Sequence, residues 1–247
     1  MTMSRIVAAE TLDSLAADDP VAQRSRRDLR RVHRAMGTRS IVQRALRDLT
    51  ASRRENAPLR MLELGAGDGS LMLGVAHALG SAWPQVELTL LDRLALVDRS
   101  TIERYAALGW TAVAEVFDVL DWAASVSDPL LKGGSTARWD VIVAHLFLHH
   151  FEGAQLAALL DAIAARSDRF FACEPRRAGL ALAGSHLIGA LGANKVTRED
   201  AVLSVHAGFR ANELTVLWPA QGVDWQVHEY SAGLFSHCFR AARLAAN

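Results

Sequence analysis

Hydrophobic and polar positions follow two different rhythms along the chain, and the change falls near residue 57. Over residues 21–36 the apolar positions recur at helical spacing and arginines fill most of the others, which predicts an amphipathic basic helix ending at Gly37. Residues 41–49 continue as a second helix. Residues 1–20 are mixed and acidic, and we expect them to form a loose leader.

From residue 58 short apolar runs alternate with helical patterns five times. The predicted strands are residues 60–64, 86–91, 111–117, 139–144 and 169–173, and the predicted helices between them include 70–79, 97–108 and 156–165. This alternation is typical of a doubly wound parallel α/β sheet with right-handed crossovers.

The end of the chain departs from this alternation. Thr197 is the expected N-cap of a helix that runs to about residue 217. Residues 225–230 and 234–241, joined by a turn at 231–233, predict a β-hairpin. We expect that antiparallel hairpin to close one edge of the parallel sheet.

Composition narrows the class of protein. The 247 residues are 51% hydrophobic and 22% charged, which excludes wholesale disorder. The 27 basic and 27 acidic residues cancel, so the chain lacks the positive field of a nucleic-acid-binding protein. Cys173 and Cys238 are far apart in the sequence, which fits a reducing cytoplasm, and no apolar run is long enough to predict a membrane span.

The segment with the clearest chemistry is Glu63-Leu64-Gly65-Ala66-Gly67-Asp68-Gly69, between a predicted strand and a predicted helix. Glycines at that place let the backbone turn sharply and approach a ligand closely. The dinucleotide pattern Gly-x-Gly-x-x-Gly is not met, because the third glycine comes one residue early and Ser70 follows it. The carboxylate of Glu63 would repel a pyrophosphate and suits an ammonium or sulfonium group.

On this motif and the strand ends that follow it, the sequence resembles the class I S-adenosylmethionine-dependent methyltransferases over residues 58–175 and in the terminal hairpin. The resemblance implies a Rossmann-like doubly wound sheet with an antiparallel C-terminal hairpin strand. It also implies a helical N-terminal cap over residues 1–57, a methyltransferase domain over 58–247 and a substrate-covering insertion at 176–196. S-Adenosyl-L-methionine is the implied cofactor, with S-adenosyl-L-homocysteine as its product.

The resemblance assigns a role to each motif residue. The glycine loop would hold the methionine part of the cofactor, Asp92 the ribose hydroxyls and Asp118 the adenine amino group. A carboxylate suits the ribose because it accepts from two neighbouring hydroxyls at once. The full set of implied cofactor contacts is Glu63, Gly65, Ala66, Gly67, Gly69, Asp92, Arg93, Asp118, Val119 and His145.

Three histidines are candidates for the catalytic base, because histidine is the usual base at neutral pH. His145 ends the fourth predicted strand, and His149 and His150 follow within one turn, in a Leu-His-His segment that resembles one seen in small-molecule members of the family. In that family the segment is often a scaffold element, so both roles stay open. No histidine or cysteine spacing predicts a metal site, and we expect none.

The resemblance implies methyl transfer to a small organic acceptor, with oxygen of a phenolic, enolic or polyketide-like compound as first choice. The tail near residues 194–201 and 206–210 is similar to a bacterial small-molecule subgroup. The apolar residues 179–191 could be a lid over a hydrophobic acceptor or the face of a homodimer, and the basic helix could be a solvated face or a site for an anionic group. An NAD(P)-dependent reductase and a non-catalytic methyltransferase-like partner protein are the alternatives.

Overall fold

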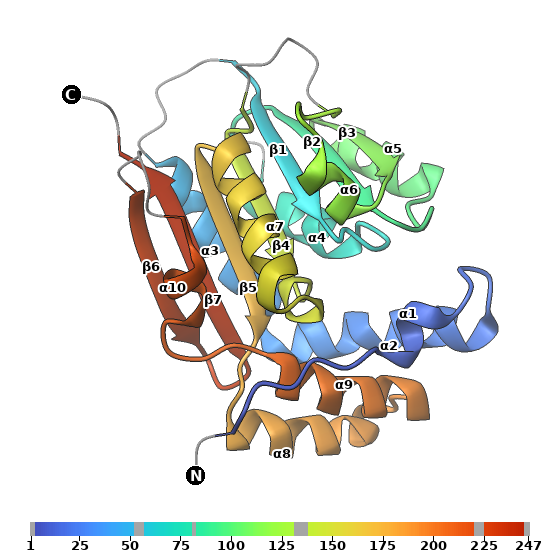
Figure 1. Cartoon of the computed structure of the whole chain (residues 1–247). Helices are drawn as coiled ribbons and strands as arrows, with labels where there is room; N and C mark the ends of the chain where they lie inside the picture. Colours follow the sequence, from blue (N-terminus) through green and yellow to red (C-terminus); the bar gives the residue numbers. More distant parts are fainter. Residues whose placement is uncertain (1–2, 52–56, 81–82, 131–137, 220–224, 245–247) are drawn as a thin grey trace.

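The computed structural model describes residues 3–51, 57–80, 83–130, 138–219 and 225–244, which form one seven-stranded sheet with helices on both faces (Figure 1). The strands are β1 (Leu59–Leu64), β2 (Val86–Asp92), β3 (Trp110–Val116), β4 (Val141–His145), β5 (Arg169–Pro175), β6 (Trp225–Ala232) and β7 (Ser236–Arg243). Their order is β3-β2-β1-β4-β5-β7-β6. The first five strands are parallel, and β7 is antiparallel to both β5 and β6. The predicted fold class is confirmed.

Two helical layers bury the faces of the sheet. One face carries α3 (Thr38–Thr50), α4 (Ser70–Leu79) and α5 (Arg99–Ala107), and the other carries α6 (Val119–Ala124), α7 (Gly153–Arg166) and α10 (Glu213–Leu217). Every residue of the central strand β4 is buried, which explains its continuous apolar run. The helix α3 contacts β5 and β7, so part of the predicted N-terminal cap lies in a sheet layer. The proposed division at residue 57 stays a prediction.

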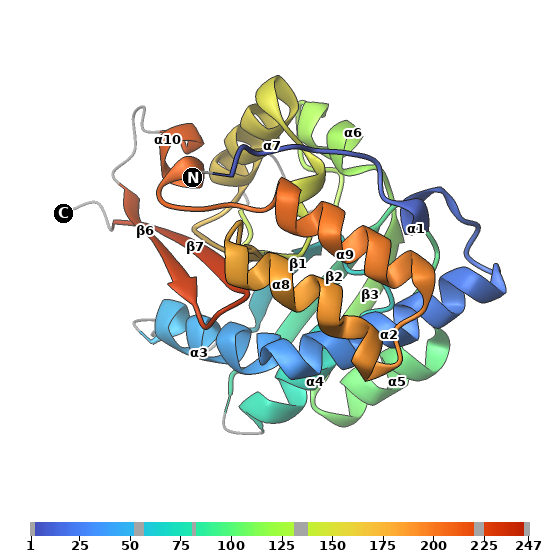
Figure 2. The ribbon, with the colours of Figure 1, turned by 90° about the horizontal axis from the view of Figure 1, so that it is seen from below.

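A third group of helices lies across the carboxyl ends of the parallel strands (Figures 1 and 2). It contains α1 (Thr11–Ser14), α2 (Pro20–Met36), α8 (Gly179–Leu187), the 3₁₀ turn η2 (Ile188–Leu191) and α9 (Lys195–Ala207). A second 3₁₀ turn, η1 (Leu148–His150), follows β4 and contacts α9. None of the described helices is long and apolar enough to cross a membrane.

The prediction of a loose leader is wrong for the part of it that the structure describes. The Ile6 N–H donates to the carbonyl of His206 at 3.1 Å, and Arg5 Nε donates to the carbonyl of Ala207 at 2.8 Å. Farther along, the Asp200 carboxylate accepts the N–H groups of Thr11 and Leu12, each at 2.9 Å. Hydrogen bonds of the backbone and of Arg5 hold this segment. Its sequence therefore shows no hydrophobic periodicity from which the packing could be predicted.

The C-terminal region also differs from the prediction in its helix ends. Asn194, rather than Thr197, caps α9, because its side chain accepts the Thr197 N–H at 2.8 Å. The helix ends at Ala207 instead of continuing to residue 217, and the chain then turns so that the Phe209 N–H donates to the carbonyl of Pro175 at 2.9 Å. The hairpin is confirmed but longer, with its turn at residues 233–235.

The junction after α9 gives a test of this packing. A Cβ on Gly208 would lie 2.3 Å from the carbonyl oxygen of Pro175, so Gly208→Ala must push two backbone segments apart. We expect the free energy of unfolding to fall by about 1–3 kcal/mol, as for other overpacked sites. Urea denaturation followed by circular dichroism measures it. Gly179→Ala is the matched control, since nothing lies within 4 Å of its added Cβ. Equal free energies of unfolding for the two variants would show that the contact between Gly208 and Pro175 is not tightly packed.

Candidate active site

A cavity of about 1060 Å³ lies at the carboxyl ends of β1, β2 and β4, under the helices α2, α8 and α9. The sheet order reverses between β1 and β4, which is where open α/β sheets bind their ligands. Its volume is at the upper end of the usual range for small-molecule sites. The space is therefore sufficient for a cofactor and a second small molecule together.

The glycine loop forms the floor of this cavity, between β1 and α4. Gly65, Gly67 and Gly69 all adopt left-handed backbone conformations, with φ of 67°, 57° and 70°. At Gly65 an added Cβ would also lie 2.2 Å from the ring of Phe147, so only glycine lets that ring cover the loop. The strand–turn–helix context predicted for this motif is confirmed.

The acidic residues at the strand ends support the loop and face the cavity. Asp92 Oδ2 accepts the Gly67 N–H at 2.8 Å, and its Oδ1 accepts the Leu94 N–H at 2.9 Å. Each oxygen keeps a lone pair for a further donor. Asp118 accepts the Leu120 N–H at 2.7 Å and so caps α6 while also lining the cavity.

A side-chain pair joins the glycine loop to the covering helix α2. Asp68 in the loop lies 2.5 Å from the guanidinium of Arg30 on α2. On the other side of the loop, the buried Tyr105 hydroxyl donates to the carbonyl of Gly69 at 2.8 Å. Side chains of α2 and α5 therefore hold the loop from two sides.

Glu63 and His145 form a buried pair at the centre of the site. Glu63 Oε1 lies 3.2 Å from His145 Nδ1, and both side chains are almost fully buried. Burial raises the pKa of Glu63, against the opposing effect of His145. Among the described residues, Glu63 Oε2 and His145 Nε2 have no hydrogen-bond partner, although both residues line the cavity. Two buried polar atoms are therefore available to a ligand.

Glu174, at the end of β5, fixes the turn that carries the other two histidines. Its carboxylate accepts the N–H groups of Phe147, Leu148 and His149, and it also contacts His149 Nδ1 at 2.8 Å. The other ring nitrogen, His149 Nε2, lies 3.5 Å from Oε1 of Glu10. Burial lowers the pKa of His149, but the two carboxylates outweigh it and raise the pKa to about 9.

His150 and Arg93 both contact the N-terminal segment. His150 Nδ1 lies 3.3 Å from Oδ2 of Asp13, and burial lowers the pKa of this histidine. Arg93 donates to the backbone carbonyl of Asp13 and lies 3.7 Å from its carboxylate. The remaining predicted contacts, Ala66 and Val119, are buried and line the same cavity.

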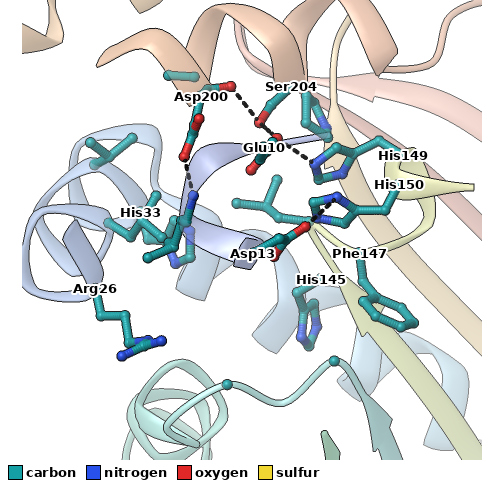
Figure 3. Close-up of a pocket in the computed structure, with 18 of the residues that line it drawn as sticks. Glu10, Asp13, Arg26, His33, His145, Phe147, His149, His150, Asp200 and Ser204 are labelled. Atoms are coloured by element: carbon teal, nitrogen blue, oxygen red, sulfur yellow. Dashed lines mark hydrogen bonds and ion pairs between the residues drawn. The ribbon is translucent and has the colours of Figure 1, made fainter. Parts of the chain in front are cut away.

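The structure therefore gathers every predicted cofactor and catalytic residue except Gly69 along the cavity wall. Other polar residues also line it, among them Glu10, Asp13 and His33, which the sequence did not assign to the site, and Arg26 from the basic helix. Figure 3 shows them with the three candidate histidines around one space. Glu10, Asp13 and His33 were missed because the leader has no apolar pattern and because the basic helix was taken mainly as a solvated face. The roles of all these residues stay predictions.

Comparison with known proteins supports the fold. A scan against family models finds no match, and a search of curated proteins finds no match. Solved structures do match. One is the plantazolicin methyltransferase BpumL in complex with S-adenosylhomocysteine and a desmethylPZN analog. It is 14% identical to this chain, with 91% of each chain covered and a TM-score of 0.60. Magnesium protoporphyrin IX methyltransferase from Synechocystis PCC 6803 is 15% identical, covering 94% of this chain and 91% of that one, with a TM-score of 0.51. An O-methyltransferase family protein from Burkholderia thailandensis is 13% identical, covering 94% of this chain and 62% of that one, with a TM-score of 0.59.

The strand order, the antiparallel terminal pair and these matches define the class I methyltransferase fold. The resemblance stated from the sequence is confirmed at the level of the fold.

A partly buried histidine on α2, His33, gives a prediction of pH dependence. Burial, with the nearby His145, lowers the pKa of His33 to about 4, against 6.5 for an ordinary histidine. The unfolded chain therefore binds a proton more readily, and the free energy of unfolding falls as the pH drops from about 6.5 to about 4. We expect protonation of His33 alone to lower the free energy of unfolding by up to about 3 kcal/mol.

Urea denaturation at pH 7.5 and pH 4.5 measures this loss. His33→Gln removes the titrating group, so its stability should fall less over that interval than that of the unmodified protein. His77→Gln, at an exposed position on α4, is the control and should fall as much as the unmodified protein. Identical losses in all three proteins would mean that His33 is not held neutral.

Proposed function

We propose that this protein is an S-adenosylmethionine-dependent methyltransferase that transfers a methyl group to a small organic acceptor, with oxygen as the accepting atom. The observation that carries the proposal is the pair of unpartnered buried atoms, Glu63 Oε2 and His145 Nε2, beside the glycine loop at the point where the strand order of the sheet reverses. The three solved proteins named above are methyltransferases, and two of them were solved with S-adenosylhomocysteine.

The described residues include a suitable partner for each polar group of the cofactor. Glu63 Oε2 is a buried acceptor suited to the ammonium of the methionine part. The free lone pairs of Asp92 suit the ribose hydroxyls, and Asp118 lies along the same wall for the adenine amino group. Arg26 is the partly buried arginine of α2 that lines the cavity, and its guanidinium suits the cofactor carboxylate.

The cofactor, when bound, supplies a methyl group on a positively charged sulfur. The protein's own part is positioning and proton transfer. With Glu63 accepting from His145 Nδ1–H, the Nε2 atom carries a lone pair that no other protein group uses, and His145 lines the cavity. His145 is thus the best placed of the three candidates to take the acceptor's proton. His149 has carboxylates at both ring nitrogens, which favours a positioning role.

The wall of the cavity under the cover favours a hydrophobic acceptor. Apolar side chains from α2, α8 and η2 line it; they are Leu29, Val32, Met36, Leu187, Ile188 and Leu191. A mostly apolar lining with a few convergent polar groups is typical of small-molecule sites. A phenolic, enolic or polyketide-like compound has that balance of apolar surface and one ionisable oxygen.

The geometry of the site gives less support to the two alternatives, an NAD(P)-dependent reductase and a non-catalytic partner protein. A pyrophosphate of NAD(P) would lie against the buried carboxylate of Glu63, which repels it. A non-catalytic partner protein would have no need of a histidine oriented by a carboxylate. Two leucines of α8, Leu180 and Leu187, are exposed and suit a homodimer face as well as a lid. Dimer formation, a cytoplasmic location and the lack of a nucleic-acid partner stay predictions.

The assignment of Asp92 can be tested by binding. Asp92→Ala removes the acceptor proposed for the ribose hydroxyls, and we expect the Kd for S-adenosylhomocysteine to rise at least tenfold, since charge-assisted hydrogen bonds contribute ~1.5–3 kcal/mol. Isothermal titration calorimetry measures it. Glu87→Ala changes an exposed acid on the same strand and should leave the Kd unchanged. An unchanged Kd in Asp92→Ala contradicts the assignment.

The role of His145 can be tested by separating turnover from binding. We expect His145→Gln to lower kcat at least 100-fold, because a general base contributes about 10²–10⁴-fold, while the Kd for S-adenosylhomocysteine changes less than threefold. Release of S-adenosylhomocysteine is measured with a phenol that the unmodified protein methylates. His228→Gln, at an exposed position on β6, is the control. Full turnover in His145→Gln would leave His145 with a structural role.

A further inference from the structure

Two histidines and a carboxylate meet on the wall of the cavity nearest the N-terminal segment. Glu10 comes from that segment, and His149 and His150 come from the turn η1 after β4 (Figure 3). One ligand atom from each residue lies within 4.8 Å of the other two. The chain separates Glu10 from the histidines by 139 residues or more, so no spacing in the sequence could reveal the group.

The spacing of His149 Nε2 and Glu10 Oε1 suits two ligands of one metal ion better than a direct hydrogen bond. His149 Nε2 and Glu10 Oε1 are 3.5 Å apart, beyond the usual N–H···O range of about 2.7–3.2 Å. Nitrogen and oxygen ligands about 2.0–2.2 Å from a tetrahedral zinc ion stand roughly 3.3–3.5 Å from one another. The gap between these two atoms is therefore one that a bridging ion fills.

The neighbours of the group orient it as they would metal ligands. Glu174 accepts from His149 Nδ1 at 2.8 Å, which turns the other ring nitrogen, Nε2, toward Glu10. A carboxylate behind a histidine ligand is the usual outer-shell arrangement of zinc sites. Ser204 Oγ donates to Glu10 Oε1, and Asp13 lies 3.3 Å from His150. Glu10, His149, His150 and Asp13 all line the cavity.

We propose that Glu10, His149 and His150 bind a divalent transition metal of the zinc class, with an open position toward the cavity that takes an oxygen of the acceptor. Two imidazoles with one carboxylate are a known catalytic zinc set, and imidazole nitrogen suits zinc, cobalt, nickel and iron. The proposal departs from the sequence expectation of no metal. Its acceptor role rests on the proposed methyltransferase function.

The metal would act on the acceptor's hydroxyl as a Lewis acid. Coordination of the oxygen would lower the pKa of the hydroxyl, and His145 Nε2 would take its proton. The oxygen would form a bond to the methyl carbon as the bond from that carbon to sulfur breaks and its electron pair returns to sulfur. The products would be the methyl ether, a neutral thioether and protonated His145, so charge and atoms balance without another reactant.

Metal binding is tested on the full chain after treatment with a chelator. Titration with Co²⁺ should give visible d–d absorption that saturates at one ion per chain and disappears when Zn²⁺ displaces it. Glu10→Gln and His150→Gln each remove a ligand and should weaken Co²⁺ binding at least tenfold. Both side chains are partly exposed, so the variants should keep the circular dichroism spectrum of the unmodified protein.

Control variants and a small anion make the test specific. His186→Gln and His228→Gln change exposed histidines away from the group and should bind Co²⁺ as the unmodified protein does. Azide should shift the Co²⁺ spectrum if one coordination position is open. Absence of stoichiometric binding, or binding that survives in the Glu10→Gln/His150→Gln double variant, overturns the site. A spectrum unaffected by azide overturns the open position.

A parallel titration with S-adenosylhomocysteine on the chelated protein separates this proposal from the function. If the chelated protein binds S-adenosylhomocysteine but no Co²⁺, the metal site is refuted and the methyltransferase proposal stands. If it binds Co²⁺ but no S-adenosylhomocysteine, the ion site stands and its role in methyl transfer is refuted.

Discussion

The arrangement of the site depends on one buried carboxylate, Glu174. It is fully buried at the end of β5, and it accepts three successive backbone N–H groups of the turn after β4. Such a charge is tolerated inside a protein only where donors surround it. By fixing that turn it places the Phe147 ring against Gly65 and orients the ring of His149. The glycine loop and the histidines are therefore positioned by the same side chain.

The cover over the sheet is the second constraint, and it is built from segments far apart in the sequence. The N-terminal segment lies along α9 through the contacts of Arg5, Ile6 and Asp200, and α2 reaches the glycine loop through Arg30. Together these segments cover the carboxyl ends of the parallel strands and form one wall of the cavity.

The sheet and the acidic residues of the cavity wall could be predicted from the sequence because their signals are local. The strands are short apolar runs, and Glu63, Asp92 and Asp118 come at or directly after strand ends, where parallel strands bring them to one edge. The N-terminal segment could not be predicted, because backbone hydrogen bonds hold it. Asn194 was missed as a cap because Thr197 has the same capping chemistry three residues later. Glu10 could not be placed beside His149 by any pattern along the chain.

The central claim is that the cavity holds S-adenosylmethionine through the glycine loop and its acidic neighbours. Calorimetric titration of the unmodified protein with S-adenosylhomocysteine, with NADP⁺ titrated in parallel, tests it most directly. The account predicts saturable binding of one S-adenosylhomocysteine per chain and no binding of NADP⁺. Binding of NADP⁺ without binding of S-adenosylhomocysteine, or binding of neither, would contradict it.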